Sequence, residues 1–511
     1  MRLLIGLMAG YFMIFSGKLS GQEKGQLIRS YFDSIKIHDL HNGNVLLAEN
    51  NHPLIIYSGG YADQRLNKRN HALSRFNLAS ISKIFTSTAI LQLREKGKLK
   101  LEDDYSRYFP EFPFKGITIQ HLLTHTSGLP NLELTEAVIK KNPDTVITNA
   151  ILMTMLQEWG KPLYFKPGDE FRYCNTNYML LALLVEKLSG LPFARYLDKY
   201  IFKPAGMSNS YLAMYGTHSW NDTARVIHQV LPTFFDSVYI PSNEVKRYRF
   251  SEYNNEAAYG SGNVISTVED ILKFDAAFFA GKLLKQASID LALTPLKLNN
   301  GQVYEDHMDT MWGDGKGYYG LGWEIFEQPG YGKAVGHGGF KFGIATFYYR
   351  SLERKQTIIA YTNGVSNFGA VVTSGFYLLN NKPAIPVDTK KSVVRAYAKA
   401  LIAGGPDHAV SMFHLYRSDT AHYYFSVKEM NFLGYDFLYQ ATFKGHQQMS
   451  LETFKLNTFL DPADYNVYDS YGEALMESGN RQDAIIMYRW SLKLNPDNEG
   501  GIKALKKLNA L

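Results

Sequence analysis

The chain has 511 residues, of which 45% are hydrophobic and 20% charged, and its formal net charge is +6 at pH 7. It is too long for one ordinary domain, and its small, scattered positive charge excludes the basic surface of a nucleic-acid-binding protein. The single cysteine, Cys174, excludes an intramolecular disulfide, so stability must come from a hydrophobic core.

The N-terminus carries one positive charge, Arg2, before an apolar run over residues 3–17, and small residues follow up to Gly21. This order is typical of a secretory signal peptide, which we predict over residues 1–21. The protein is then expected to be periplasmic or secreted. An uncleaved anchor helix is the alternative, but the run is short for a bilayer span. We expect no stable membrane insertion after cleavage.

Two strand-like runs around a polar turn predict a β-hairpin over residues 43–60. Helical periodicity follows in several stretches, namely 80–98, 117–130, 145–160, 176–189 and 267–280. Three short runs over residues 333–363 then predict an antiparallel meander. We expect the hairpin and the meander to form one antiparallel sheet, flanked by helices and a helical subdomain, in an α+β fold.

A Pro- and Asn-containing stretch at 380–386 is typical of a linker, and the chain beyond it has a helical pattern. Aromatic and small residues there fall at the spacing of a tetratricopeptide (TPR) unit, with a looser copy upstream. We therefore predict one large α+β domain over 22–385 and an all-α, TPR-like domain over 386–511. The TPR-like tail is a candidate surface for a protein partner.

One short stretch carries a candidate nucleophile, Ser80, three residues before Lys83. On a helix the two side chains share a face, and the helix N-terminus favours negative charge. A serine with an amine in reach suits covalent catalysis. Two later stretches supply partners. The first is Tyr173-x-Asn175, in which a phenol could pass protons if an ammonium lowers its pKa. The second is His337-Gly338-Gly339, whose glycines let a substrate backbone approach.

These three motifs, in this order, resemble the serine β-lactamase and penicillin-binding-protein superfamily. The branch that they resemble holds class C β-lactamases, D-alanyl-D-alanine carboxypeptidases and related esterases. The resemblance covers residues 40–380 and is also carried by further stretches, at 121–128, 259–262 and 319–323. It implies an antiparallel sheet flanked by helices, which agrees with the pattern of strands and helices.

The resemblance implies a role for each matched residue. Ser80 would be the acylated nucleophile, Lys83 the proton-shuttling amine and Tyr173 its partner base and acid. Asn175 would position the substrate. The remaining implied residues are His337, Gly338 and Gly339 for substrate binding, and the backbone N–H groups of Ser80 and Phe340 for an oxyanion hole. Such a mechanism needs no metal and no cofactor, and its substrate is a small molecule or a peptide.

The third motif departs from the Lys-Thr-Gly or Lys-Ser-Gly that is frequent in the superfamily. His337 is expected to be only partly charged near neutral pH, and Gly338 has no hydroxyl. Both changes weaken recognition of a substrate carboxylate. We therefore expect ester, amide or peptide substrates. A D-alanyl-D-alanine carboxypeptidase or a β-lactamase is one alternative, and a non-catalytic binding protein with the same fold is another.

Two histidines, His121 and His125, have the i, i+4 spacing of a zinc helix, but Leu122 occupies the position where a metalloprotease has Glu. We interpret both as structural, bonded to nearby backbone. We also expect Cys174 to be a packed thiol and not a reactive one.

Overall fold

The computed structural model describes residues 21–306, 315–364 and 367–510, so the predicted signal peptide lies outside the described residues. The chain divides into two compact units. The first comprises the described residues up to Ala62, Arg69–Val226 and Tyr253–Pro386. The second comprises Asp63–Lys68, Ile227–Glu252 and the chain from Val387 on. The sequence pattern did not predict that the first two of these segments join the helical tail.

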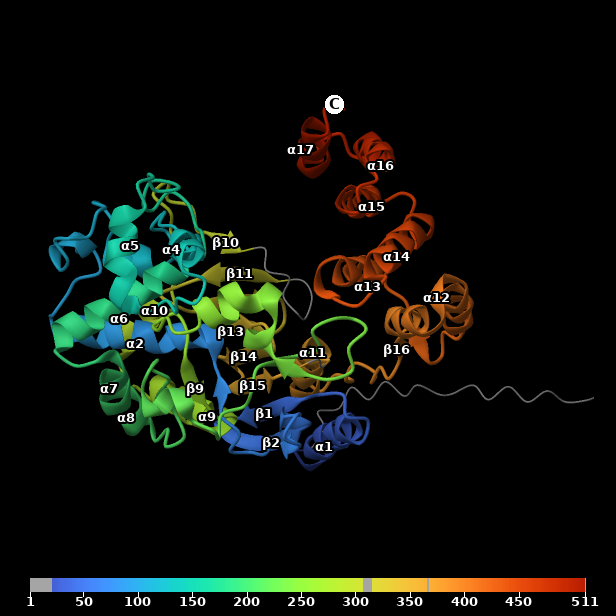
Figure 1. The fold of residues 1–511 in the computed structure, drawn as a ribbon. Coiled ribbons are helices and arrows are strands. Elements are labelled where there is room, and N and C mark those ends of the chain that lie inside the picture. The colour runs from blue at the N-terminus through green and yellow to red at the C-terminus, as the bar shows by residue number, and fades with distance from the viewer. Residues whose placement is uncertain (1–20, 307–314, 365–366, 511) are drawn as a thin grey trace, which may run out of the picture. The chain divides into compact units, whose positions relative to one another are not determined.

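The first unit is built on one eight-stranded sheet with the order β10-β11-β12-β13-β14-β15-β1-β2 (Figure 1). Its strands are β1 (Gly43–Glu49), β2 (His52–Gly59), β10 (Glu305–Asp306), β11 (Lys316–Tyr319), β12 (Glu324–Gln328), β13 (Gly332–Lys341), β14 (Ile344–Ser351) and β15 (Gln356–Thr362). Every neighbouring pair is antiparallel. The predicted hairpin and meander are confirmed, and β1 joins them by pairing with β15.

Helices cover both faces of this sheet. Leu46 of β1 belongs to the core shared with α2 (Ser82–Glu95) and α9 (Val268–Phe279). An added Cβ on Gly375 of α11 (Phe368–Leu379) would lie 3.0 Å from Leu47, the next residue of β1. Successive strand residues face opposite sides, so α2 and α9 lie on one face and α11 on the other. The sequence pattern therefore produced the α+β architecture that was predicted.

The remaining helices of the first unit are mostly short. They are α1 (Gly21–Ile37), α3 (Ile119–Leu123), α4 (Glu136–Lys141), α5 (Leu152–Glu158), α6 (Asn175–Ser189), α7 (Phe193–Leu197), α8 (Lys203–Ala205) and α10 (Gln286–Ala292). The chain also has short strands, namely β3 (Tyr61–Asp63), β4 (Lys68–Arg69), β5 (Phe76–Asn77), β6 (Tyr211–Leu212), β7 (Gln229–Val230), β8 (Ile240–Pro241) and β9 (Val264–Ser266). Of these, β5, β6 and β9 belong to the first unit and β7 and β8 to the second, while β3 and β4 fall where the chain passes between the units.

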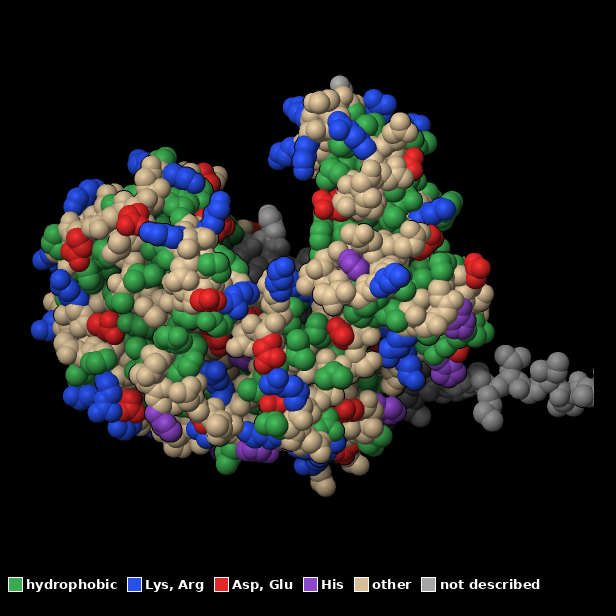
Figure 2. All heavy atoms as spheres, viewed as in Figure 1, with side chains coloured by type: hydrophobic (Ala, Val, Ile, Leu, Met, Phe, Trp, Pro, Cys, Tyr) green, Lys and Arg blue, Asp and Glu red, His purple; other side chains and the backbone are tan. Residues whose placement is uncertain are grey.

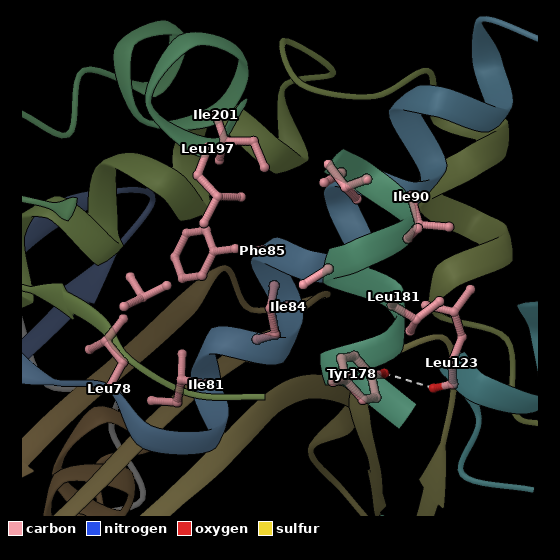
Figure 3. Close-up of a cluster of buried hydrophobic side chains, with 14 of the residues drawn as sticks. Leu78, Ile81, Ile84, Phe85, Ile90, Leu123, Tyr178, Leu181, Leu197 and Ile201 are labelled. Atoms are coloured by element: carbon pink, nitrogen blue, oxygen red, sulfur yellow. Dashed lines mark hydrogen bonds between the residues drawn. The ribbon is translucent and has the colours of Figure 1, made fainter. Parts of the chain in front are cut away.

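Helix α2 lies at the centre of the helical subdomain. Figure 3 shows Ile84, Phe85 and Ile90 of α2 packed among side chains of neighbouring helices, including Leu123 of α3 and Leu181 of α6. Almost every residue of α2 is buried, including several polar ones, so the helix is packed on all sides and cannot shift without opening the core. The residues at its N-terminus are therefore held rigidly.

The second unit is helical. Its elements after the linker are β16 (Lys391–Ser392), α12 (Val393–Ser418), β17 (Tyr423–Tyr424), α13 (Val427–Tyr435), α14 (His446–Leu460), α15 (Tyr465–Glu477), α16 (Arg481–Leu494) and α17 (Glu499–Lys507). Two helix pairs repeat one packing detail. Gly434 of α13 lies against the ring of Phe454, and Gly472 of α15 lies against the ring of Tyr488. In both pairs the glycine lets an aromatic ring approach the neighbouring helix closely.

Acidic and basic side chains are interspersed over the face of the molecule shown in Figure 2, with basic side chains gathered around α16 and α17. The described residues include no helix that is both long and apolar enough to cross a membrane.

Candidate active site

Ser80 lies on a single 3-10 turn, Ala79–Ile81, that connects β5 to α2. Ala79 has a φ of 47°, in the left-handed region that costs a non-glycine residue roughly 1–2 kcal/mol. The turn is fixed by hydrogen bonds from Ala79 N to Asn77 Oδ1 (2.9 Å) and from Thr346 Oγ1 to Leu78 O (2.8 Å). This strained connection leaves the Ser80 side chain partly exposed, while its neighbours are buried.

Lys83 is fully buried, and its Nζ has three polar neighbours. It lies 3.1 Å from Ser80 Oγ, 2.9 Å from Asn175 Oδ1 and 3.0 Å from Ser261 O. Burial lowers the pKa of Lys83 to about 7, although Cys174 and Glu324 act in the opposite direction. A neutral amine has two hydrogens, which the two carbonyl oxygens accept, so its lone pair faces the Ser80 hydroxyl. This is the geometry of a general base for Ser80.

Tyr173 lies just before α6, and its phenol hydrogen-bonds to the Ser80 hydroxyl. The ring centroid is 4.7 Å from Lys83 Nζ. The expectation that a nearby ammonium lowers the pKa of this phenol is wrong. Burial raises the pKa of Tyr173 well above its usual value, and the hydrogen bond to Ser80 opposes this rise. Tyr173 is therefore a proton donor at neutral pH, because its base form is too rarely populated.

Asn175 begins α6 and connects the second motif to the first. Its side-chain oxygen accepts from Lys83, and its backbone N–H donates to Asn131 Oδ1 at 2.8 Å. The structure thus brings the predicted residues Ser80, Lys83, Tyr173 and Asn175 together. The contact between Asn175 Oδ1 and Lys83 Nζ orients the Lys83 amine, as expected for an Asn side chain that holds the lysine.

Strand β13 brings the third motif against the Ser80 turn. A Cβ added to Gly339 would lie 2.3 Å from Thr346 Oγ1 and 2.5 Å from Leu78 O, so only glycine fits there. At Gly338 an added Cβ would meet no atom of the described residues within 4 Å, so these residues would tolerate a side chain there. The Phe340 side chain is exposed, at the end of the same strand. The close packing at Gly339 places β13 beside Ser80, as an oxyanion hole requires.

A chain of hydrogen bonds, which the sequence did not predict, connects the second and third motifs through Tyr319. Cys174 N donates to His125 Nδ1 (3.0 Å), so the proton of this imidazole is on Nε2, 3.2 Å from the Tyr319 hydroxyl. The hydroxyl of Tyr319 in turn lies 3.2 Å from His337 Nε2. Since His337 Nδ1 is 2.5 Å from Gly338 O, it carries the proton, and Nε2 accepts from Tyr319. Two backbone groups therefore set the tautomers, the Cys174 N–H that of His125 and the Gly338 carbonyl that of His337.

The expectation of a partly charged His337 is wrong. The side chain is 1% exposed, and burial lowers its pKa to about 3, with the positive charge of Lys83 acting in the same direction. His125 is also neutral, because burial lowers its pKa well below the usual value. The charged group beside the third motif is instead Glu324, at the start of β12. Its Oε1 lies 3.5 Å from His337 Nδ1, and its Oε2 accepts from Gly338 N at 3.1 Å.

The two histidines with zinc-like spacing are structural, as interpreted from the sequence. His121 Nδ1 accepts from Thr118 N in a capping box, and His125 lies beyond the end of α3 with a φ of 59°. Across the ranges that the structure describes, no cluster of His, Cys, Asp and Glu could hold a metal ion. Cys174 is buried, and burial raises the pKa of its thiol to about 11, so it is the packed thiol that was expected.

A model of the family "Beta-lactamase" matches residues 28–376. Penicillin-binding protein 4* of Bacillus subtilis is 31% identical over 386 residues, which are 73% of this chain and 81% of the relative. The crystal structure of a penicillin-binding protein from Bacillus halodurans is similar at 26% identity and a TM-score of 0.55, over 69% of this chain and 98% of that one. D-amino acid amidase from Ochrobactrum anthropi SV3 shares the fold at 20% identity and a TM-score of 0.57, over 70% and 99%.

Proposed function

The chain belongs to the β-lactamase family of serine hydrolases, and from that premise we propose that it is an exported hydrolase that forms an acyl-enzyme on Ser80. Its proposed substrates are esters, amides or peptides. The observation that carries the proposal is the buried Lys83 amine, whose Nζ lies 3.1 Å from Ser80 Oγ. A pKa of about 7 leaves a large neutral fraction of this amine near neutral pH.

The proposed acylation begins when Lys83 takes the proton of Ser80 and Oγ attacks the substrate carbonyl. The resulting oxyanion is stabilised by the backbone N–H groups of Ser80 and Phe340. The Tyr173 phenol gives its proton to the leaving group as the bond to the acyl carbon breaks. The Lys83 ammonium, beside the Tyr173 ring, restores that proton. Water then hydrolyses the ester on Ser80 by the same groups in reverse.

The third motif supports esters and amides over substrates that must be held by a carboxylate. A Lys at the position of His337 would offer a fixed positive charge, but His337 is neutral and buried. Among the proposed substrates, we therefore favour neutral esters and amides over β-lactams and over peptides that are held by their C-terminal carboxylate.

A fluorophosphonate probe with peptide mass spectrometry tests the nucleophile. We expect the wild type to be labelled on Ser80 and Ser80→Ala to lose both labelling and activity, by at least about 10³-fold. Ser82→Ala is the matched control. Its hydroxyl is buried and accepts from Val264 N, so labelling at Ser80 should persist. Labelling that survives Ser80→Ala would refute the assignment. An unlabelled wild type would favour a binding protein.

Export and a role for the tail are part of the same proposal. Cell fractionation of the full chain should recover activity outside the cytoplasm, with the N-terminal 21 residues absent from the mature protein. The paired helices α13–α14 and α15–α16 are proposed as a surface for a protein partner. Deleting residues 386–511 should then abolish partner capture without removing Ser80 labelling. Capture that persists after this deletion would contradict the role of the tail.

A further inference from the structure

A cavity of about 430 Å³ lies at the end of the sheet that is remote from the Ser80 turn. The turns β1–β2 and β14–β15 form one side, and the end of α9 together with α10 forms the other. Small-molecule sites have volumes of about 300–1,000 Å³. Arg350 in the cavity wall lies four residues along β14 from Thr346, whose hydroxyl bonds to Leu78 O below the Ser80 turn. About 13 Å of strand therefore separates the cavity from the candidate active site.

Arg350 is a buried cation in this wall, with 5% of its surface exposed. Its Nη1 donates to Asn51 Oδ1 (2.8 Å), Asp275 Oδ2 (2.7 Å) and Thr357 Oγ1 (3.1 Å). Asp275 is fully buried and balances the charge, and its other oxygen accepts from the Tyr348 hydroxyl. Within the described ranges, the enclosed Nε has no acceptor. Nε and Nη2 form the edge of a guanidinium that can pair with a carboxylate, and this edge is left unused.

Two further donors stand on the same side of the cavity. Asn50 N donates to Lys355 O at 2.9 Å, which holds the two turns together. The Asn51 side-chain oxygen is occupied by Arg350, so the amide offers its NH₂ group. Lys355 is exposed, and it forms no ion pair with any residue that the structure describes. The strand side of the cavity thus presents hydrogen-bond donors and no carboxylate.

The helix side is mainly apolar. Phe279, Ile289 and Leu293 line it, and the Phe279 ring centroid lies 5.3 Å from the Arg350 guanidinium carbon. The carboxylate in the lining, Asp290, belongs to this side, and its Oδ1 accepts from the amide of Gln286 on the same helix at 2.8 Å. A wall of donors therefore faces an apolar wall, and this asymmetry suits a molecule with one anionic end.

We propose that this cavity binds a small carboxylate with an apolar body, such as an arylalkyl carboxylate of about 10–15 non-hydrogen atoms. The carboxylate accepts hydrogen bonds from Arg350, Asn51 and Lys355. The apolar body lies against Phe279 and Leu293, where its removal from water favours binding. This site goes beyond the proposed function, because it lies away from Ser80 and needs no acyl-enzyme.

Calorimetric titration of the full chain with 4-phenylbutyrate tests the proposal. The neutral analogue 4-phenylbutyramide keeps the apolar body and lacks the charge. We expect the carboxylate to bind with a Kd of about 1 mM or below, at least about 10-fold tighter than the amide. Butyrate keeps the carboxylate and lacks the ring, so it should bind at least about 10-fold more weakly than 4-phenylbutyrate.

Two variants locate the bound probe. Ala276 is half-buried in the cavity wall, and Ala276→Phe should fill part of the volume and weaken binding at least about 10-fold. Lys355→Gln should weaken binding of the carboxylate about 3- to 10-fold and leave the amide unchanged. Lys282→Gln is the matched control, because Lys282 is exposed after the end of α9 and does not line the cavity. Lys355 is exposed, so its variant still decides the matter if Ala276→Phe does not fold.

The fluorophosphonate separates this cavity from the active site. Protein labelled on Ser80 should bind 4-phenylbutyrate with an unchanged Kd. The inference is overturned if the wild type binds no 4-phenylbutyrate at about 10 mM, binds the amide equally well, or loses binding once Ser80 is labelled. An affinity that is unchanged in both Lys355→Gln and a folded Ala276→Phe would overturn it as well. All of these results leave the labelling of Ser80 standing, and only an unlabelled wild type rejects the proposed function.

Discussion

The two walls of the site bury polar groups in different ways. The helical wall (Ser80, Lys83, Asn175) holds one amine among three oxygens, and burial brings its pKa to about 7. The strand wall (His337, Tyr319, Glu324) is a hydrogen-bonded chain whose imidazoles stay neutral. In the helical wall, burial disfavours the ammonium form of Lys83, so the neutral amine is available as a base. In the strand wall the polar groups hydrogen-bond to one another, and these bonds fix the position of β13.

The largest effect is expected at Lys83, because the helical wall depends on its amine. Lys83→Met should lower kcat/KM by about 10³-fold or more while raising the melting temperature at pH 7. The pKa of the Lys83 amine is lower in the folded protein than in the unfolded chain. Burial of the ammonium form therefore opposes folding below pH 7, and this penalty is relieved as the pH rises from 7 toward 10. Lys83→Met removes this penalty and should raise the free energy of unfolding by a few kcal/mol near pH 7.

Enzyme assays and thermal melts from pH 6 to 10 check this prediction. Lys98→Met, at an exposed position after the end of α2, is the control and should change neither quantity. A Lys83→Met protein that is less stable than the wild type at pH 7 would contradict the cost of burial assigned to the helical wall.

The contact between the two walls can be broken at Gly339. In Gly339→Ala the new Cβ would overlap Thr346 Oγ1 and Leu78 O, forcing β13 away from the Ser80 turn. We expect kcat/KM to fall by about 10²-fold and the free energy of unfolding by roughly 1–3 kcal/mol. Gly338→Ala is the matched control, since its Cβ would meet no atom of the described residues within 4 Å, and its stability should equal that of the wild type by urea unfolding. Equal stability of both variants would argue against the packing at Gly339.

A smaller effect is expected when the chain of hydrogen bonds in the strand wall is cut. Tyr319→Phe leaves His125 Nε2–H and His337 Nε2 buried without the hydroxyl that joins them. Each such loss costs roughly 1–3 kcal/mol, and we expect kcat/KM to drop about 10- to 50-fold. Tyr318→Phe, one residue earlier on β11, is the control for loss of a phenolic hydroxyl. Similar melting temperatures for the two variants would show that the chain contributes nothing to stability.

The sequence predicted the helical wall far better than the strand wall. Ser80, Lys83, Tyr173 and Asn175 lie in two local motifs, and the hairpin and meander follow from short-range alternation of residues. Tyr319 and Glu324 lay in or beside a stretch noted only as a family signature. His125 is 194 residues from Tyr319 in the chain, and His337 lies on the next long strand, β13. Their protonation depends on burial, which local pattern does not reveal. For this reason the expected charge on His337 and the expected pKa of Tyr173 were both wrong.

The smallest expected effect concerns the pH dependence of kcat/KM, which shows whether the titrating group lies in the helical wall or in the strand wall. The wild-type kcat/KM for a neutral ester should rise with pH through a single inflection near 7, because the base form of Lys83 is the active one. The pKa of His337 is lowered to about 3, so this residue is already neutral throughout the range and contributes no inflection. His337→Gln should therefore reduce activity without moving the inflection of the profile from pH 5 to 9. An inflection that disappears in this variant, or activity that falls as pH rises through 7, would mean that the strand wall carries the titrating group.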